Sequence, residues 1–331
     1  MKTAAIVGWT GNGSLDDLSR TALGKLPSDG AEVTSAARSL TVRGEDPIAV
    51  ARKLAHLPGV RWIAAGYQFK GLDECLSRLR LLATRYLGGD SSFAVGVEVE
   101  GSGKEEGDVL MEATSTLLRS ARGSRVDEKN PDVMFRVIMV RGSGACGVQL
   151  REGAGGVPTS REMKASCLVS GGYHSAVAAW MAANSGFSLT LVHARDDDGS
   201  LRQVARLYAE LSQRIDPSSL RLEVLQGRDT AGDRVAAWLR SAEGEVFAGV
   251  HPECRGTAGM DMLRRYPSVL FPLLFLQEGE IRSRLDSLGL KGTTTDREAG
   301  LKLSNRRARF TVKTFGGREA DQNAVLDSIL A

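Results

Sequence analysis

Short apolar and polar blocks alternate along the chain and predict an α/β protein. Residues 1–66 open with the apolar run AAIVGW, and later blocks predict helices at residues 15–23 and 47–57. The segments SLTVRG and VRWIAAGY have the composition of strands. The resulting β-α-β-α-β order fits a small ferredoxin-like domain.

Residues 67–152 predict a second unit. Helices are expected at residues 71–85 and 108–121, and FAVGVEVEG (residues 93–101) alternates as a half-buried strand does. Two more strands, VMFRVIMVR and GACGVQLR, close the unit. The Gly, Pro, Ser and Thr residues that begin at Gly153 then predict a linker over residues 153–163.

Residues 164–331 alternate strand and helix in the manner of an open, doubly wound parallel sheet. The predicted strands are ASCLV, SLTLVHA, RLEVLQG, EVFAGV and SVLFPLLF, and the predicted helices cover residues 176–183, 203–214, 230–242 and 278–288. Ligands bind at the carboxyl ends of such strands. The turn after ASCLV and the segment after Val250 should therefore share one edge of the sheet.

The turn after ASCLV carries the clearest chemistry. Its residues are Ser170, Gly171, Gly172, Tyr173, His174 and Ser175. The glycines let a ligand approach the backbone, and amide groups at a helix N-terminus favour an anion such as phosphate. No Lys follows, which excludes the GxxxxGK[ST] loop. An ordinary strand-to-helix turn with a Gly and a Ser cap explains the same residues.

Composition narrows the class. With 331 residues, 42% of them hydrophobic, the chain can bury two or three cores. It has no apolar run of about 18 residues and no charged-then-apolar leader, so we expect a cytoplasmic protein with no membrane segment. The four cysteines form no CxxC pair, so neither disulfides nor a metal site is predicted. A net charge of +3 permits nucleic-acid binding without arguing for it.

Three motifs in order give a family resemblance. VDEKNPDV (residues 126–133) is similar to V-D-L-x-N-P-D-v, GAGGVP (153–158) to G-P-G-G-L-P, and SGGYHSAVAAW (170–180) to S-G-G-x-D-S followed by P-V-A-A-W. All three patterns are typical of the tRNA 4-thiouridine synthetases, the THUMP-containing tRNA sulfurtransferases that are also linked to thiamine biosynthesis. Weaker similarity covers most of the chain.

The resemblance implies an architecture and an activity. Residues 1–66 would form the N-terminal ferredoxin-like domain, 67–152 the THUMP RNA-binding domain, and 164–331 a PP-loop, adenine nucleotide α-hydrolase-like domain. In this family the loop at Ser170, Gly171, Gly172, Tyr173, His174 and Ser175 binds ATP with Mg²⁺, the uridine carbonyl oxygen is adenylated, and a persulfide sulfur attacks the activated carbon. The implied partners are tRNA and a persulfide-donating sulfurtransferase, and a homodimer is an open alternative.

The chain departs from the family pattern at His174, which stands where the loop aspartate is expected. An imidazole is not a hard oxygen ligand, so an aspartate role in holding Mg²⁺ would be lost. A protonated imidazole that contacts phosphate directly is the alternative.

Three further departures lie downstream. HPECRGTAGMD (residues 251–261) replaces the family's SLGQ-containing segment, the R-R-M-M-type stretch is missing, and residues 288–300 contain no Cys. A catalytically decayed paralogue that acts as an RNA-binding or partner protein would explain all of these departures.

Cys254 is the cysteine expected at the active edge, and it is the candidate sulfur carrier. His251 and Arg255 flank it and would favour the thiolate. A loop cysteine with no role is the alternative reading. Cys75, Cys146 and Cys167 lie in predicted helices and strands and are expected to be structural.

Candidate RNA contacts are spaced around the NPD turn. They are Arg119, Arg122, Arg125, Arg136 and Arg141. Glu98 and Glu100 lie on the strand between the two predicted helices and offset part of this charge. The basic run at residues 302–318 suits either RNA contact and base stacking or an edge strand guarded by charges.

Overall fold

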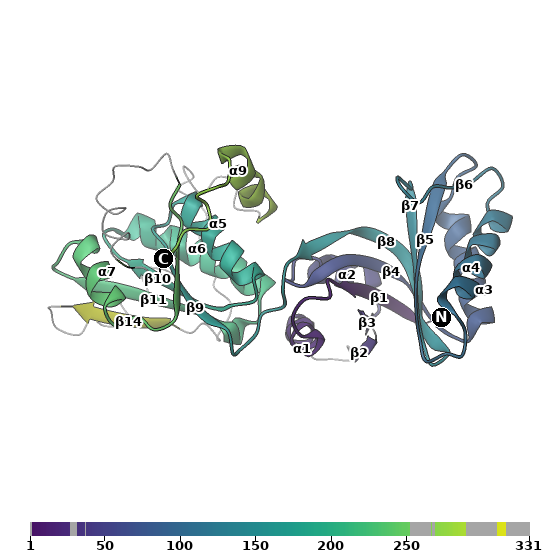
Figure 1. Ribbon diagram of the computed structural model, residues 1–331, viewed down its shortest axis with the longest axis horizontal. Helices are drawn as coiled ribbons and strands as arrows, with labels where there is room; N and C mark the ends of the chain where they lie inside the picture. The colour runs from purple at the N-terminus through teal and green to yellow at the C-terminus, as the bar shows by residue number, and fades with distance from the viewer. Residues whose placement is uncertain are drawn as a thin grey trace. The chain divides into compact units, whose positions relative to one another are not determined.

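The computed structural model describes residues 2–26, 32–36, 38–251, 266, 269–288 and 310–315. The chain divides into two compact units, Met1–Pro158 (unit 1) and Thr159–Ala331 (unit 2), which are described separately (Figure 1). The division lies within the predicted linker. Among the described helices, none is long and apolar enough to cross a membrane.

Unit 1 is built on one sheet with the strand order β2-β3-β1-β4-β8-β7-β5-β6. Its strands are β1 (Thr3–Trp9), β2 (Glu32–Ala36), β3 (Ser39–Arg43), β4 (Val60–Lys70), β5 (Ser92–Glu100), β6 (Arg125–Val126), β7 (Val133–Val140) and β8 (Ser143–Gly155). Neighbouring strands are antiparallel, except that β5 runs parallel to both β6 and β7. Its helices are α1 (Leu15–Lys25), α2 (Pro47–Leu54), α3 (Leu72–Tyr86) and α4 (Glu106–Ser120).

Helices cover two of the hydrophobic cores that lie along this sheet. One packs Leu18 of α1 and Leu54 of α2 on the strands at the β1 end. The other packs Leu79 of α3 and Leu117 of α4 on the strands at the β7 end (Figure 1). The predicted boundary between residues 66 and 67 falls inside β4, so the two predicted N-terminal domains share one continuous sheet.

The β-α-β-α-β order predicted for the first 66 residues omitted one strand that the structure contains. The structure adds β2, which pairs antiparallel with β3 and makes the order β-α-β-β-α-β. The sequence EVTSA gave little signal because β2 lies at the sheet edge, where a strand has few apolar positions to bury.

Unit 2 has the predicted parallel sheet, with the strand order β13-β12-β9-β10-β11-β14. Its strands are β9 (Lys164–Leu168), β10 (Ser188–Ala194), β11 (Leu220–Gly227), β12 (Glu245–Ala248), β13 (Val269–Leu270) and β14 (Phe310–Phe315). All paired strands are parallel. Its helices are α5 (Tyr173–Asn184), α6 (Asp198–Arg214), α7 (Ala231–Leu239) and α9 (Glu278–Ser287), with a short 3₁₀ turn at Pro217–Ser219.

The strands at the two edges of this sheet can be compared with the predictions for SVLFPLLF and for the basic run at residues 302–318. SVLFPLLF was expected to be a full strand, but β13 covers only Val269–Leu270 and a turn follows. Pro272 cannot donate to a strand ladder, which accounts for the early end. At the other edge, β14 pairs with β11 and with no other described strand, so among the described strands Phe310–Phe315 is an edge strand.

Candidate functional site

The loop after β9 folds as a strand-to-helix turn whose backbone is shaped by a glycine. Gly172 is the N-cap of α5 and contributes no side-chain cap. Gly171 has φ +88°, and a Cβ there would lie 3.0 Å from the carbonyl oxygen of Ser200. Glycine is therefore required at residue 171 both for the backbone conformation and for the close packing.

Two serines hold this loop in place. The Ser175 hydroxyl donates to the carbonyl of Gly172 at 2.8 Å and accepts from the Ser170 N–H at 3.3 Å. The Ser170 hydroxyl accepts from the Gly172 N–H at 3.4 Å. Ser175 is buried whereas Ser170 is exposed, so Ser175 stabilises the turn and Ser170 faces solvent.

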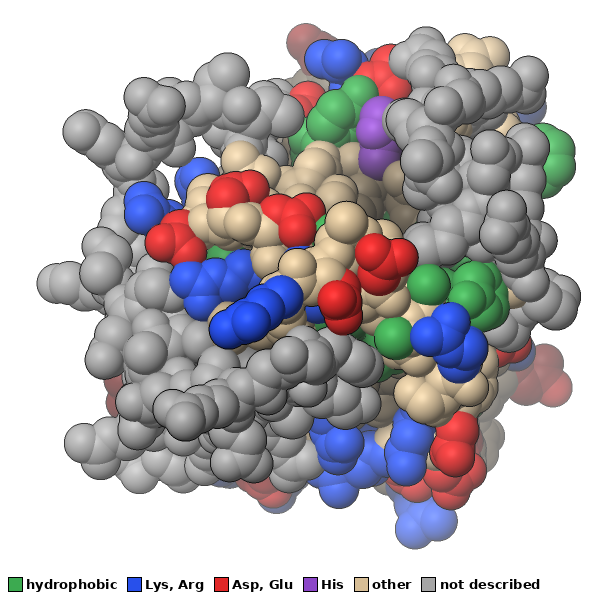
Figure 2. Space-filling view, turned by 90° about the vertical axis from the view of Figure 1, so that its left-hand side faces the viewer, with side chains coloured by type: hydrophobic (Ala, Val, Ile, Leu, Met, Phe, Trp, Pro, Cys, Tyr) green, Lys and Arg blue, Asp and Glu red, His purple; other side chains and the backbone are tan. Residues whose placement is uncertain are grey.

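A cavity of about 380 Å³ lies at the carboxyl ends of β9, β10 and β12. Ser170 and Ser175 line it, together with the segment before α6 and the first residues of α7. Figure 2 shows this side of unit 2, where acidic and basic side chains lie around backbone and uncharged polar side chains. Parallel sheets bind ligands at this edge, and the first turns of helices offer amide groups to an anion.

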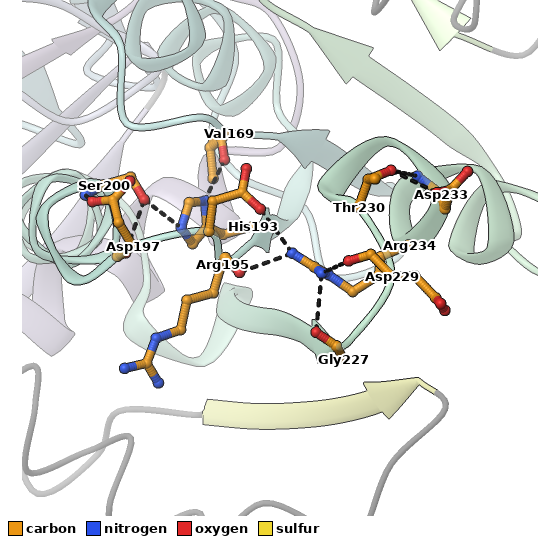
Figure 3. Close-up of polar contacts among 11 residues, drawn as sticks. Val169, His193, Arg195, Asp197, Ser200, Gly227, Asp229, Thr230, Asp233 and Arg234 are labelled. Atoms are coloured by element: carbon orange, nitrogen blue, oxygen red, sulfur yellow. Dashed lines mark hydrogen bonds and ion pairs between the residues drawn. The ribbon is translucent and has the colours of Figure 1, made fainter.

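His193 closes the floor of the cavity (Figure 3). Its Nδ1 lies 2.8 Å from the Val169 carbonyl oxygen and its Nε2 lies 3.3 Å from the Ser200 hydroxyl. Burial lowers the pKa of His193, which outweighs the opposite effects of the Val169 carbonyl and of Asp196 and Asp197. The ring therefore favours its neutral form and ties the end of β9 to the start of α6.

Arg234 ties two of the loops around the cavity together (Figure 3). One terminal nitrogen donates to the carbonyls of Gly227, at 3.2 Å, and Asp229. The other donates to the Arg195 carbonyl at 2.8 Å and to Asp196 Oδ1 at 3.0 Å. The side chain is only 3% exposed, and its guanidinium holds the loops after β10 and β11 together.

Tyr173 and His174, unlike the two serines, do not line this cavity. His174 Nε2 lies 3.4 Å from Glu278 Oε2, and the Tyr173 hydroxyl donates to Glu278 Oε1 at 2.7 Å. The ring of His251 stacks on that of His174, with centroids 5.3 Å apart and planes 9° apart. The ligand atoms of His174, His251 and Glu278 all lie within 4.8 Å of one another.

Hydrogen bonds keep the carboxyl group of Glu278 ionised. Burial pushes its pKa upward, but hydrogen bonds from Tyr173, Arg282 and His174 outweigh burial and leave the pKa below its usual value. The pKa of Tyr173 is raised, first by burial and then by its hydrogen bond to Glu278. Tyr173 is therefore the proton donor of this pair.

The three cysteines that the structure describes are buried, as predicted for structural residues. Cys75, Cys146 and Cys167 are fully buried, and burial raises the pKa of Cys167 far above its usual value. All three cysteines are therefore core residues. Cys254, the candidate sulfur carrier, lies outside the described residues, and its role stays a prediction.

The predicted RNA-binding arginines fall into different environments. Arg119, Arg122 and Arg125 are exposed at the end of α4 and the start of β6. Arg136 is half-buried, with its guanidinium 4.5 Å from the ring centroid of Trp62 and its Nε 2.9 Å from Gln149 Oε1. Arg136 is thus engaged within unit 1, whereas the other three are accessible.

Arg141 lies apart from the exposed trio. It forms the turn between β7 and β8, and its N–H bonds to the Glu100 carbonyl at the end of β5. Arg125 pairs with Ser92 at the start of β5. A strand of this length separates the two by roughly 25 Å, at about 3.3 Å per residue. The structure therefore gathers three of the five predicted arginines.

The sequence analysis did not identify the residues that are distant in sequence but contact this loop or the loops around the cavity. Glu278 lies 104 positions from His174, and Arg234 lies 38 from Asp196. No local pattern links such pairs. The one available signal was that Glu278 opens the predicted helix 278–288, where an acidic residue is typical in any case.

Known proteins provide partial matches to this chain. No protein-family model matches it. The probable tRNA sulfurtransferase of Bacillus subtilis is 28% identical over 159 residues, which cover 47% of this chain and 39% of that protein. The probable tRNA sulfurtransferase of Methanocaldococcus jannaschii is 31% identical over 90 residues, covering 27% of this chain and 24% of the other. The matched regions thus span well under half of these relatives.

Solved structures share the fold over a greater length. A 4-thiouridine synthetase–RNA complex with bound ATP has a TM-score of 0.67 at 18% identity, covering 89% of this chain and 86% of the other. A Pyrococcus horikoshii protein has a TM-score of 0.64 at 20% identity, covering 87% of this chain and all of that one. The chain is therefore similar in sequence to tRNA sulfurtransferases over part of its length, and it shares its fold with a 4-thiouridine synthetase.

Proposed function

We propose that unit 2 binds an adenine nucleotide in the cavity at the carboxyl edge and that the chain acts as an ATP-dependent tRNA sulfurtransferase. The observation that carries this proposal is the cavity itself, lined by Ser170, Ser175 and the first residues of α7. Its volume of about 380 Å³ falls within the range of about 300–1,000 Å³ found for ligand pockets. The sequence relatives named tRNA sulfurtransferase support the same activity.

The lining of the cavity suits the parts of ATP and its counter-ion. Ser170 and the amides of the loop suit the phosphates, while Leu168, Val192 and Val235 offer an apolar wall for the base. Asp196 and Asp197 are the carboxylates of the cavity, and carboxylates with phosphate oxygens are the ligands that Mg²⁺ prefers. In this proposal these aspartates replace the loop aspartate, whose position His174 occupies.

The remaining steps follow the family. Adenylation of a uridine carbonyl oxygen would release pyrophosphate, and sulfur from a persulfide-donating partner would then displace AMP. The exposed Arg119, Arg122 and Arg125 would contact tRNA phosphates. Cys254 stays the candidate sulfur carrier.

Calorimetry with ATP, AMP and pyrophosphate in the presence of Mg²⁺ tests the nucleotide site. We expect micromolar to millimolar binding to the wild type and none to Gly171→Val, because residue 171 has φ +88° and lies close to Ser200. Gly279→Ala is the control, since a Cβ there meets open space. Circular dichroism must show that both variants are folded. A wild type that binds none of these ligands would overturn the nucleotide proposal.

A salt titration of tRNA binding tests the RNA surface. Arg119, Arg122 and Arg125, all changed to Ala, should bind tRNA about tenfold or more weakly, with a salt slope shallower by about two to three. The control changes Arg52, Lys53 and Arg80 to Ala, which removes the same charge from other exposed positions of unit 1. Equal losses in both triple variants would show that only net charge matters.

The second candidate function is a non-catalytic RNA-binding paralogue. The observation that favours it is that His174 pairs with Glu278 instead of lining the cavity. This alternative predicts that tRNA binds while no nucleotide does. The two titrations above therefore separate the two functions.

A further inference from the structure

We propose that His174, His251 and Glu278 form a binding site for a divalent transition-metal ion, with Zn²⁺ as the best match. The three residues come from the first turn of α5, the segment after β12 and the first turn of α9. In the described part of the chain this is the one group of ligand-type side chains that converges to metal-binding distances. The site is independent of the proposed nucleotide binding.

The distance between His174 and Glu278 suits two ligands of one ion. Nε2 and Oε2 are 3.4 Å apart, which is long for a charge-assisted hydrogen bond of about 2.7–2.9 Å. Two ligands of a tetrahedral ion with bonds of about 2.0–2.1 Å are about 3.4 Å apart. The widest separation in the cluster, at most 4.8 Å, closes to that value through a side-chain shift of about an ångström and a half, together with a rotation of the His174 ring out of its parallel stack on His251.

Neighbouring groups orient the carboxylate as a ligand. Oε1 of Glu278 accepts from the Tyr173 hydroxyl at 2.7 Å and from Arg282 Nε at 2.8 Å. These bonds fix the carboxylate and direct Oε2 toward His174. Metal-binding carboxylates are typically held by outer hydrogen bonds of this kind.

The backbone orients His251 in a similar way. Its Nε2 lies 3.2 Å from the Leu276 carbonyl oxygen, and the ring is only 5% exposed. One tautomer of the ring donates its Nε2–H to this carbonyl. A metal-binding imidazole almost always donates its other N–H to a carbonyl or carboxylate, so the arrangement has the expected outer partner.

The ligand set selects the class of ion. Two imidazoles and one carboxylate are a known set for zinc, with water in the fourth position. Mg²⁺ and Ca²⁺ prefer oxygen ligands and are disfavoured here. The ion would lie beside the phosphate loop, because a Cβ at Gly249, which lines the cavity, would be 2.5 Å from the His174 carbonyl oxygen.

Zinc titration of untagged, EDTA-treated full-length protein tests the site. We expect one equivalent to bind, with affinity at least about a hundredfold weaker in His174→Ala and in Glu278→Gln. Tyr173→Phe should cost about tenfold through the outer hydrogen bond. Co²⁺ should give visible absorption bands in the wild type that the two ligand variants lose. These variants are chosen because His174 and Glu278 are partly exposed, so their loss is tolerated by the fold.

The control is His56→Gln, a half-buried histidine of unit 1 that should leave zinc affinity unchanged. Thermal melts of the metal-free variants must match that of the wild type. The proposal is overturned if the wild type binds no zinc, or if both ligand variants bind it as tightly as the wild type. It is equally overturned if Cys254→Ser abolishes binding while Glu278→Gln retains it, because the ion would then lie elsewhere.

Discussion

The first turn of α5 contributes to two sites that are built in different ways. The cavity at the carboxyl edge takes Ser170 and Ser175, five positions apart, from one turn, while the rest of its lining comes from other strands and helices. The cluster of His174, His251 and Glu278 joins side chains from segments up to 104 residues apart. An anion site needs mainly backbone amides and small side chains, so one segment can encode it. A ligand cluster requires tertiary structure to bring its members together.

The largest expected effect is on the cavity alone. Arg234→Met should cost about 2–4 kcal/mol of unfolding free energy, because the carbonyls of Arg195, Gly227 and Asp229 lose their charged donor. Nucleotide binding should fall as the loops after β10 and β11 loosen, while zinc affinity should change little. Urea unfolding, followed by the two ligand titrations, measures these effects.

Arg240→Met is the matched control, because Arg240 is exposed just past the end of α7. It should change stability by less than about 0.5 kcal/mol. If Arg234→Met weakened zinc and nucleotide binding equally, the two sites would not be separable, and the contrast drawn above would be wrong.

The next effect should reach both sites at once. A Cβ at Gly249 would lie 2.5 Å from the His174 carbonyl and from the Ser175 Cα. Gly249→Ala should therefore cost about 1–3 kcal/mol by overpacking and weaken both nucleotide and zinc binding. Gly232→Ala is the control at the same cavity, since its Cβ meets nothing closer than 3.8 Å. A harmless Gly249→Ala would show that β12 and α5 can move apart freely.

The same contrast explains what the sequence could predict. The parallel sheet of unit 2, the loop and most helices follow from apolar periodicity and Gly placement, which are local signals. The loop from Ser170 to Ser175 was found because its residues are consecutive. Glu278 and Arg234 were not found, because their partners lie on other elements.

Unit 1 shows the same limit for charged residues. The spacing of five arginines suggested one RNA surface, yet Arg136 packs on Trp62, which lies on β4. Burial lowers the pKa of Arg136 in this position. Composition can count positive charges, but only the packing shows which of them are accessible.

The smallest expected effect is a pH dependence that belongs to the cavity side. Burial lowers the pKa of His193 in the folded protein below the unfolded value of about 6.5. As pH falls below about 6.5, the unfolded state takes up a proton first, so the folded state loses stability. The contribution of His193 is fully present above that pH and declines toward its folded pKa, by at most about 1.4 kcal/mol per pH unit.

Urea unfolding of the wild type and of His193→Gln at pH 7.5 and pH 5.5 measures this contribution. The glutamine side chain does not titrate, so it removes the proton equilibrium of the imidazole. Stability should therefore fall more between these pH values in the wild type than in the variant. A larger fall in the variant would mean that His193 is charged when folded, held by Asp196 and Asp197. The cavity would then carry a positively charged side chain of its own, beside its two aspartates.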